Sequence, residues 1–226
     1  MLTLLFDIDG TLINTGGAGG TALIEAFRED FNIDNPAKVP FSGCTDRGIG
    51  TNLFAQHGID DSLENWQRLR DGYLARLPVH LSQRDGRVLA GVLRLLNQLK
   101  SLDTVAIGLL TGNLEEGARI KLSYFGLLEH FAFGGFGDEY RNRDGVAGAA
   151  LTAAIQHANG SFDSGRVWVI GDTPLDISCA RAIDAKVLAV ATGMHPANEL
   201  ADLQPDLLLE DLTDTELVLN RLTTDT

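Results

Sequence analysis

The stretch Phe6-Asp7-Ile8-Asp9-Gly10-Thr11-Leu12, close to the start of the chain, decides the fold. It closes an apolar segment, residues 2–6, which predicts a short buried strand. Side chains two residues apart in an extended chain point the same way. We therefore expect Asp7 and Asp9 to share one side at the carboxyl end of this strand, and Ile8 to point to the other side.

A turn follows the two carboxylates, because Gly10 permits a sharp change of direction and Thr11 places a hydroxyl just beyond it. Two like charges ~4 Å apart repel by about 4 kcal/mol at an effective dielectric constant near 20. A divalent cation, a bound cationic group or a shared proton must relieve that repulsion. The alternative interpretation is a strand that ends in an ordinary polar turn, where Asp and Gly are common.

The composition limits the kinds of protein this can be. The 226 residues, 44% of them hydrophobic, can form one large domain or one domain with an insertion. A net charge of −13 argues against nucleic acid and anionic membrane surfaces as partners. No apolar run approaches the roughly 18–20 residues of a membrane span, and the first residues lack the basic region of a signal peptide. Cys44 and Cys179 lack metal-ligand spacing, so we expect reduced thiols in a cytoplasmic protein.

Strand and helix patterns alternate after residue 91, which predicts a parallel sheet with helical crossovers, as in Rossmann-like α/β folds. The expected strands are residues 2–6, 104–110, 131–134, 166–170, 186–191 and 206–209. The expected helices are residues 92–99, 114–124 and 146–157, and a further one that begins at Pro174.

Residues 16–87 lose this alternation and predict a helical insertion after the first strand. A glycine-rich connection, residues 14–20, leads to a helix with apolar residues 23–31. Thr45-Asp46 and Asp61-Ser62 can each cap a further helix. We therefore divide the chain into a core, residues 1–15 and 88–226, and a helical cap domain, residues 16–87.

Polar residues follow three of the expected strands. In a parallel sheet the ligand site lies beyond the carboxyl ends of the strands, where the strand order reverses. Asp7 and Asp9, Thr111-Gly112-Asn113, and Asp172 should therefore meet in one crevice.

These residue types suit phosphoryl transfer. Asp7 can attack phosphorus, and Asp9 can protonate the leaving oxygen and later deprotonate a water molecule. Thr111 offers a hydroxyl and Gly112 a backbone amide to phosphate oxygens. Carboxylates without a His or Cys cluster select Mg²⁺. The expected ligands are Asp7, Asp9, Asp172 and Asp176.

The motifs resemble those of the haloacid dehalogenase superfamily of phosphohydrolases, over about residues 2–210. Asp7 to Leu12 looks like the first motif, Thr111-Gly112-Asn113 like the second, and Gly171 to Asp176 like the fourth. The insertion corresponds to the family's helical C1 cap. The resemblance implies phosphoryl transfer, because dehalogenases lack the acid at Asp9.

The third motif departs from the family's pattern. Its usual Lys is replaced in Asn142-Arg143-Asp144, where Arg143 is our candidate for the catalytic cation because it lies closest to the helix start. Arg141 or Lys121 are the alternatives. Asp172 and Asp176 could also be a helix N-cap and a first-turn acid.

Substrate contacts are expected from both parts of the chain. The phosphate-binding candidates are Gly10, Thr11, Gly112 and Asn113. The resemblance adds the loop of Thr45, Asp46 and Arg47, with Arg47 as the substrate-binding candidate; an ordinary helix cap is the alternative there. The cap should close over the crevice, with hinges near residues 16–17 and 84–87.

The sequence thus predicts a Mg²⁺-dependent phosphatase that acts on a small phosphorylated metabolite through an aspartyl phosphate. Phosphoglycolate phosphatase is the nearest label that the resemblance suggests. The alternatives are a β-phosphoglucomutase-like sugar-phosphate mutase and a non-enzymatic phospho-acceptor module. No particular oligomeric state is predicted.

Overall fold

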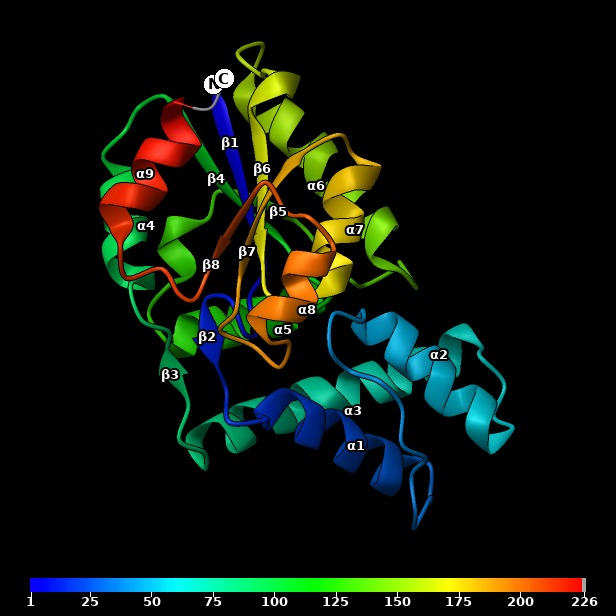
Figure 1. Ribbon diagram of the computed structural model, residues 1–226. Helices are drawn as coiled ribbons and strands as arrows, with labels where there is room; N and C mark the ends of the chain where they lie inside the picture. Colours follow the sequence, from blue (N-terminus) through cyan, green and yellow to red (C-terminus); the bar gives the residue numbers. More distant parts are fainter. Residues whose placement is uncertain (225–226) are drawn as a thin grey trace.

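A parallel six-stranded sheet forms the centre of the molecule, in the order β5-β4-β1-β6-β7-β8 (Figure 1). The computed structural model describes residues 1–224. The strands are β1 (Leu2–Phe6), β4 (Val105–Leu110), β5 (Phe133–Gly135), β6 (Val167–Gly171), β7 (Lys186–Val190) and β8 (Leu207–Leu209). The predicted Rossmann-like α/β fold and its six strands are confirmed.

Alternation along β1 sends its side chains into two separate apolar clusters. Leu2, Leu4 and Phe6 pack into the cluster under α4 (Val92–Lys100), α5 (Glu115–Tyr124) and α9 (Thr215–Thr224), whereas Leu5 packs into the cluster under α6 (Arg143–Ala158), α7 (Pro174–Ala182) and α8 (Ala197–Asp202). Two layers of helices therefore enclose the sheet (Figure 1). The same alternation points Asp7, the next residue but one after Leu5, towards α6 and α7.

Three further helices form a layer of their own beyond the carboxyl ends of the strands (Figure 1). This three-helix layer consists of α1 (Ala18–Asp30), α2 (Asp46–His57) and α3 (Leu63–Ser82), which share a separate apolar cluster. The chain enters the layer through β2 (Ile13–Asn14) and leaves it through β3 (Arg87–Val88). These two segments pair as an antiparallel ribbon, so both crossings lie side by side.

Two predicted helix starts in this layer are confirmed. The Thr45 hydroxyl accepts a hydrogen bond from the backbone N–H of Gly48 (2.9 Å), and the Ser62 hydroxyl accepts one from Asn65 (3.3 Å). Each hydroxyl satisfies a backbone donor that the first turn of a helix would leave unpaired.

Several elements differ from the sequence prediction. The ribbon β2/β3 was not expected, because strands of two residues are too short to show a period. The glycine-rich connection ends earlier than expected, since α1 begins at Ala18 and includes Gly19. Helices α8 and α9 were also not predicted, and α6 begins at Arg143 because the Asn142 side chain accepts a hydrogen bond from Gly145 N (3.0 Å).

Within the described residues, no helix combines the length and the apolar character needed to span a membrane.

Candidate active site

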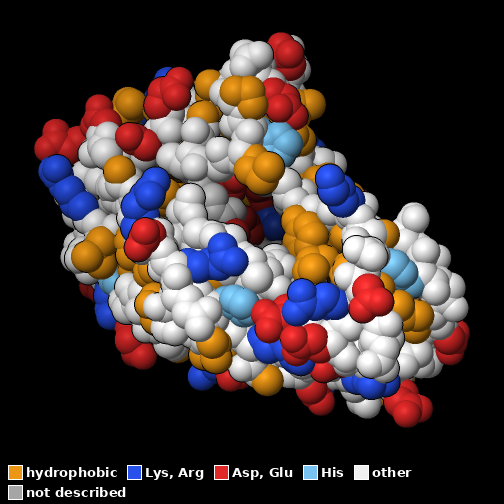
Figure 2. Space-filling model, turned by 90° about the horizontal axis from the view of Figure 1, so that it is seen from below, with side chains coloured by type: hydrophobic (Ala, Val, Ile, Leu, Met, Phe, Trp, Pro, Cys, Tyr) orange, Lys and Arg blue, Asp and Glu red, His pale blue; other side chains and the backbone are white. Residues whose placement is uncertain are grey.

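A cavity of about 380 Å³ lies between the carboxyl ends of the strands and the three-helix layer. We call it the crevice. Asp7, Thr111 and Asp172 line it from the ends of β1, β4 and β6. Figure 2 looks into the hollow, where charged side chains lie at the floor and hydrophobic side chains border it. Its volume is near the lower end of the range of small-molecule sites.

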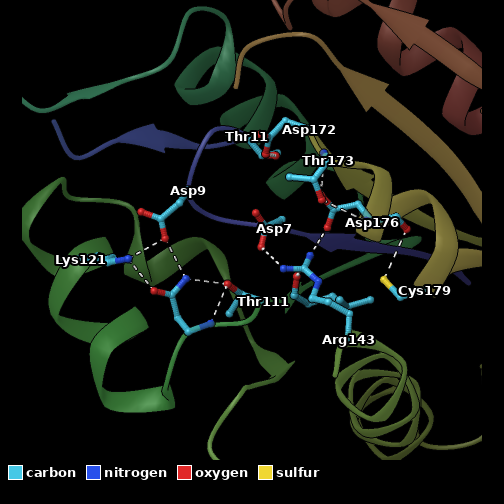
Figure 3. A network of polar contacts seen from close by, with 12 residues as sticks. Asp7, Asp9, Thr11, Thr111, Lys121, Arg143, Asp172, Thr173, Asp176 and Cys179 are labelled. Atoms are coloured by element: carbon cyan, nitrogen blue, oxygen red, sulfur yellow. Dashed lines mark hydrogen bonds and ion pairs between the residues drawn. The ribbon is translucent and has the colours of Figure 1, made fainter. Parts of the chain in front are cut away.

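Asp7 is buried at the floor of the crevice and is 4% exposed. Its backbone N–H donates to the carbonyl of Ile170 (2.9 Å), which continues the pairing of β1 with β6 past the last strand residue. Its carboxylate accepts a hydrogen bond from Arg143 Nη1 (3.1 Å; Figure 3). Ile8 points away into the apolar core, as the alternation predicts.

Asp9 has other partners. Its Oδ2 accepts hydrogen bonds from Lys121 Nζ (2.6 Å) and from Asn113 Nδ2 (2.9 Å), and its side chain is 40% exposed. Lys121 also donates to Asn113 Oδ1 (2.6 Å), so the three side chains form a closed network (Figure 3). Each of the two carboxylates, Asp7 and Asp9, therefore has its own cation.

Arg143, the first residue of α6, is the cation beside Asp7. It is 5% exposed and also donates to Asp176 Oδ1 and to the carbonyl of Leu110 (3.4 Å). Arg141 lies elsewhere, with a side chain that is 60% exposed and paired with Asp61 (2.8 Å). The structure therefore brings Arg143 and Lys121 into the crevice, and not Arg141.

Asp176 takes part in the capping box of α7, whose N-cap is Thr173, and also belongs to the carboxylate cluster. Thr173 donates to Asp176 Oδ2 from its backbone (2.9 Å) and its hydroxyl (2.8 Å), and Thr173 Oγ1 accepts from Asp176 N (3.2 Å). Pro174 occupies the first helical position of α7. This reciprocal capping box fixes Asp176 at the edge of the crevice.

Thr11 lies behind the crevice. Its hydroxyl donates to Asp172 Oδ1 (2.8 Å) and is buried. The prediction that Thr11 binds phosphate is therefore not supported by its position, because it orients a carboxylate of the site and does not line the cavity. Gly10, Gly112 and Asn113 do line it. A side chain at Gly112 would meet the carbonyl of Cys44 at 2.2 Å, so only glycine fits between β4 and the loop before α2.

Burial and mutual repulsion raise the pKa values of two acids in the crevice. The pKa of Asp7 is raised to about 7, mainly by burial, with Asp176 and Asp9 adding to the shift and Arg143 opposing it. The pKa of Asp172 is raised to about 8, again mainly by burial, with Asp176 and Asp7 adding to the shift. The sequence predicts two carboxylates short of positive charge at Asp7 and Asp9; in the structure the pair is Asp7 and Asp172, because Asp9 is paired with Lys121.

One cation site fits these residues. Oxygen atoms of Asp7, Asp172 and Asp176 lie within 4.8 Å of one another, in a set of hard donors that suits Mg²⁺. Both oxygens of Asp176 already accept hydrogen bonds, so Asp7 and Asp172 retain the freer oxygens. The carboxylate of Asp9 lies outside this group, because it is paired with Lys121. Of the four expected ligands, the structure therefore brings three carboxylates together, and a role of Asp9 in metal binding stays a prediction.

Arg47 does not reach the crevice, contrary to the expectation that it contacts substrate. Its guanidinium pairs with Asp61 (2.7 Å) and lies over the ring of Trp66, 4.9 Å from the centroid. These contacts hold it inside the three-helix layer. Its neighbour Asp46 lines the crevice instead, with its carboxylate accepting from the backbone N–H of Leu114 (2.9 Å).

Sequence reasoning did not single out the loop after β7. Thr192 Oγ1 donates to the carbonyl of Gly10 (2.5 Å), and Gly193 and Met194 also line the crevice. A side chain at Gly193 would meet Asp172 Oδ2 at 1.7 Å, so the loop packs directly on that carboxylate. The sequence pattern that could have identified this loop is a polar residue directly after an expected strand, since Thr192 follows residues 186–191 as Thr111 follows residues 104–110.

Solved structures resemble the whole chain. A hydrolase from Pseudomonas syringae superposes with a TM-score of 0.74 at 21% identity, covering 98% of this chain and 99% of the other. A predicted phosphoglycolate phosphatase from Haemophilus somnus gives 0.67 at 16% identity (96% and 97% covered), and a candidate β-phosphoglucomutase from Thermotoga maritima gives 0.62 at 19% (98% and 99%).

No curated protein matches the sequence. The model of the haloacid dehalogenase-like hydrolase family matches residues 4–190, which include the ends of β1, β4 and β6 and the start of α6. The chain therefore belongs to the haloacid dehalogenase-like hydrolase family.

Proposed function

We propose that the protein is a Mg²⁺-dependent phosphatase that hydrolyses a small phosphorylated metabolite through a phosphoryl group carried on Asp7. The observation that supports this most is the position of Asp7, buried at the floor of the crevice between Arg143 and Asp172. Similar structures named as phosphatases agree with this class of reaction.

The first half-reaction transfers the phosphoryl group to Asp7. An oxygen of Asp7 forms a bond to phosphorus, while the bond from phosphorus to the leaving oxygen breaks. The exposed carboxyl of Asp9 gives its proton to that oxygen, so the product leaves as an alcohol. Arg143, held against Asp7, offers its positive charge to the phosphoryl oxygens, and Thr111 and the Gly112 amide offer hydrogen bonds.

The second half-reaction frees Asp7. Asp9, now deprotonated, accepts a proton from a water molecule whose oxygen attacks the same phosphorus. The bond between phosphorus and Asp7 breaks, which releases inorganic phosphate and restores both carboxylates to their starting states. When bound by Asp7 and Asp172, with Asp176 behind them, Mg²⁺ would supply the positive charge that these acids lack and would polarise a phosphoryl oxygen.

The three-helix layer fits the role of a cap, residues 16–87, that closes the crevice and excludes water. The β2/β3 ribbon and residues 84–87 join it to the sheet side by side. Arg84 links the two connections, donating to the carbonyl of Gly16 (3.0 Å) and to the Thr21 hydroxyl in α1 (2.8 Å). Hinge motion at this point would move the layer as one body.

The test is an assay of purified protein on p-nitrophenyl phosphate, with and without Mg²⁺. Release of inorganic phosphate that depends on Mg²⁺ is the expected result. When a sugar monophosphate is supplied in place of p-nitrophenyl phosphate, the mutase alternative predicts an isomerised sugar phosphate with little free phosphate. A phospho-acceptor module predicts at most one phosphate per protein chain on either substrate. Either result would replace the proposed function.

Mg²⁺ should stabilise the protein more at high pH than at low pH. The folded-state pKa values of Asp7 and Asp172, about 7 and about 8, lie above their ordinary value of 3.8. From about pH 4 to pH 8 the folded state therefore holds protons that the unfolded state has lost, and stability falls as the pH rises. Mg²⁺ replaces those protons. The rise in Tm on adding Mg²⁺ should be clearly larger at about pH 8 than at about pH 5.5.

The variant Asp172→Ala is the control for this experiment, and it should lose most of the Mg²⁺ response at about pH 8. Equal stabilisation of the two proteins by Mg²⁺, or a response that is independent of pH, would contradict the metal site.

Lys121→Met should weaken hydrolysis of alkyl phosphates more than that of aryl phosphates. Lys121 and Asn113 hold the carboxyl of Asp9 in place for proton transfer. General acid catalysis typically contributes ~10²–10⁴-fold, and a poor leaving group depends on it most. We expect kcat to fall at least tenfold more on an alkyl phosphate than on p-nitrophenyl phosphate, with partial rescue in Lys121→Arg. A uniform loss on both substrates would show that Lys121 has only a structural role.

A further inference from the structure

The three-helix layer, with the loop before α2, lines the side of the crevice opposite the catalytic carboxylates. This half of the lining carries the apolar side chains Leu23, Phe41, Ile49 and Tyr73, together with uncharged small residues. Among its lining residues, Asp46 alone is charged. A leaving group attached to a phosphate at Asp7 must lie against this surface, because the phosphate itself occupies the floor.

The cationic side chains of the crevice already form ion pairs with carboxylates of the protein. Of the side chains that line it, only Lys121 and Arg143 are cationic, and each is paired with carboxylates. They face the lining acids Asp7, Asp9, Asp46 and Asp172, and Arg143 also pairs with the buried Asp176. The two cations and one divalent cation carry four positive charges, which these five carboxyl groups take up before the phosphate itself arrives. No cation is left for a second acidic group on the substrate.

Nearby cationic groups are held outside the lining. Arg47 is paired with Asp61 and covers Trp66, and Arg84 is bound to the carbonyl of Gly16. His195 lies between Glu199 (2.8 Å) and the Ser42 hydroxyl (3.0 Å), at the junction of the two parts of the molecule. Each of these side chains would have to leave its own partner before it could bind a carboxylate in the crevice.

From this distribution of charge we propose that the substrate is a phosphomonoester whose leaving group carries no negative charge and presents an apolar face. The inference rests on the proposed phosphatase function and narrows it. It disfavours carboxylated substrates such as phosphoglycolate, although the resemblance to phosphoglycolate phosphatases suggested them.

The decisive comparison uses two ligands of nearly the same shape, phosphoglycolate and phosphoglycolamide, in which a neutral amide replaces the carboxylate and the phosphate is unchanged. Each is tested as a competitor of p-nitrophenyl phosphate hydrolysis by the wild-type protein with Mg²⁺. We expect the amide to compete at least tenfold more strongly, and raised salt to narrow this ratio because it screens the repulsion of the carboxylate. Equal competition, or stronger competition by phosphoglycolate, would overturn the proposal and leave the phosphatase function intact.

A variant that adds a cation to the lining tests whether the missing positive charge is what disfavours carboxylated ligands. Ser42 lies on the lining loop before α2 and is only partly buried, so Ser42→Arg adds a cation without opening the core. Ser42→Gln is the matched control, because it is also long and also loses the contact with His195. Ser42→Arg should move the preference towards phosphoglycolate at least fivefold relative to Ser42→Gln, and an unchanged ratio would count against the proposal.

Hydrolysis of p-nitrophenyl phosphate by the wild-type protein tests the phosphatase function separately from the substrate class. If this activity is present, the competition ratio alone decides on the substrate class. If it is absent in the presence of Mg²⁺, the proposed function fails and the inference about its substrate fails with it.

Discussion

Replacing Asp7 by Asn should remove turnover of any phosphomonoester, to below about one per cent of the wild-type rate. An amide oxygen is a poor nucleophile towards phosphorus, and no other carboxylate occupies the position of Asp7 at the floor of the crevice, paired with Arg143. The variant should also fold, because Asn fills the same volume and can still accept a hydrogen bond from Arg143. The measurement is kcat on p-nitrophenyl phosphate, together with the Tm of the same sample.

Asp9→Asn is the matched comparison. Its loss should be smaller, within the ~10²–10⁴-fold range of general acid–base catalysis, because the nucleophile remains. If Asp7→Asn kept more than about one per cent of the activity, or if Asp9→Asn proved the more damaging change, the nucleophile would have to be sought elsewhere in the crevice.

Arg143→Ala should give the second large effect, on stability and on activity together. It leaves Asp7 and Asp176 without their shared partner at buried positions. Removing one member of a buried ion pair typically costs about 3–5 kcal/mol. It also removes the cation expected to contact the phosphate. We expect a clearly lower Tm at about pH 8 and a fall in kcat/KM of several hundredfold or more.

Two further variants sharpen this test. Arg143→Lys should retain part of the activity, because a point charge can serve phosphate, although it cannot bridge Asp7 and Asp176 as the planar guanidinium does. Arg141→Ala should change little, since its pair with Asp61 lies at the surface, where such pairs contribute about 0–1 kcal/mol. A larger loss in Arg141→Ala than in Arg143→Ala would contradict the assignment.

The sheet and most of its helices could be predicted because their signals are local. The apolar run of residues 2–6 and the helix caps Thr45 and Ser62 depend only on neighbouring residues, and the structure confirms them. The end of the chain could not be predicted in the same way. Helix α9 packs on α4, which lies on the same face of the sheet, and this contact between distant parts of the chain leaves no signal in its own sequence.

In the site, too, features with a local sequence signal could be predicted, whereas contacts between distant residues could not. Strand ends brought Asp7, Thr111 and Asp172 together as expected, because the carboxyl ends of parallel strands share one edge. The partners of each side chain could not be predicted. Lys121 reaches Asp9 from the last turn of α5, and the room for it comes from Gly19, where a side chain would lie 3.0 Å from its Nζ.

Arg47 shows the limit of reasoning from position in the chain. It is the second residue of α2, at the end of the helix from which a contact with the crevice was expected. However, Asp61 and Trp66, which hold it away, lie on a different part of the three-helix layer. Only the packing of α2 on α3 shows where the guanidinium points.

Borohydride trapping reports on the phosphoryl group that Asp7 is proposed to carry. Wild-type protein is mixed with substrate and Mg²⁺, treated with borohydride, digested and analysed by peptide mass spectrometry. An aspartyl phosphate is reduced to the alcohol of homoserine, whereas a free carboxylate is not. We expect homoserine at position 7, and only in samples that received substrate. Homoserine at position 9 or 172, or none at all while phosphate is being released, would contradict it.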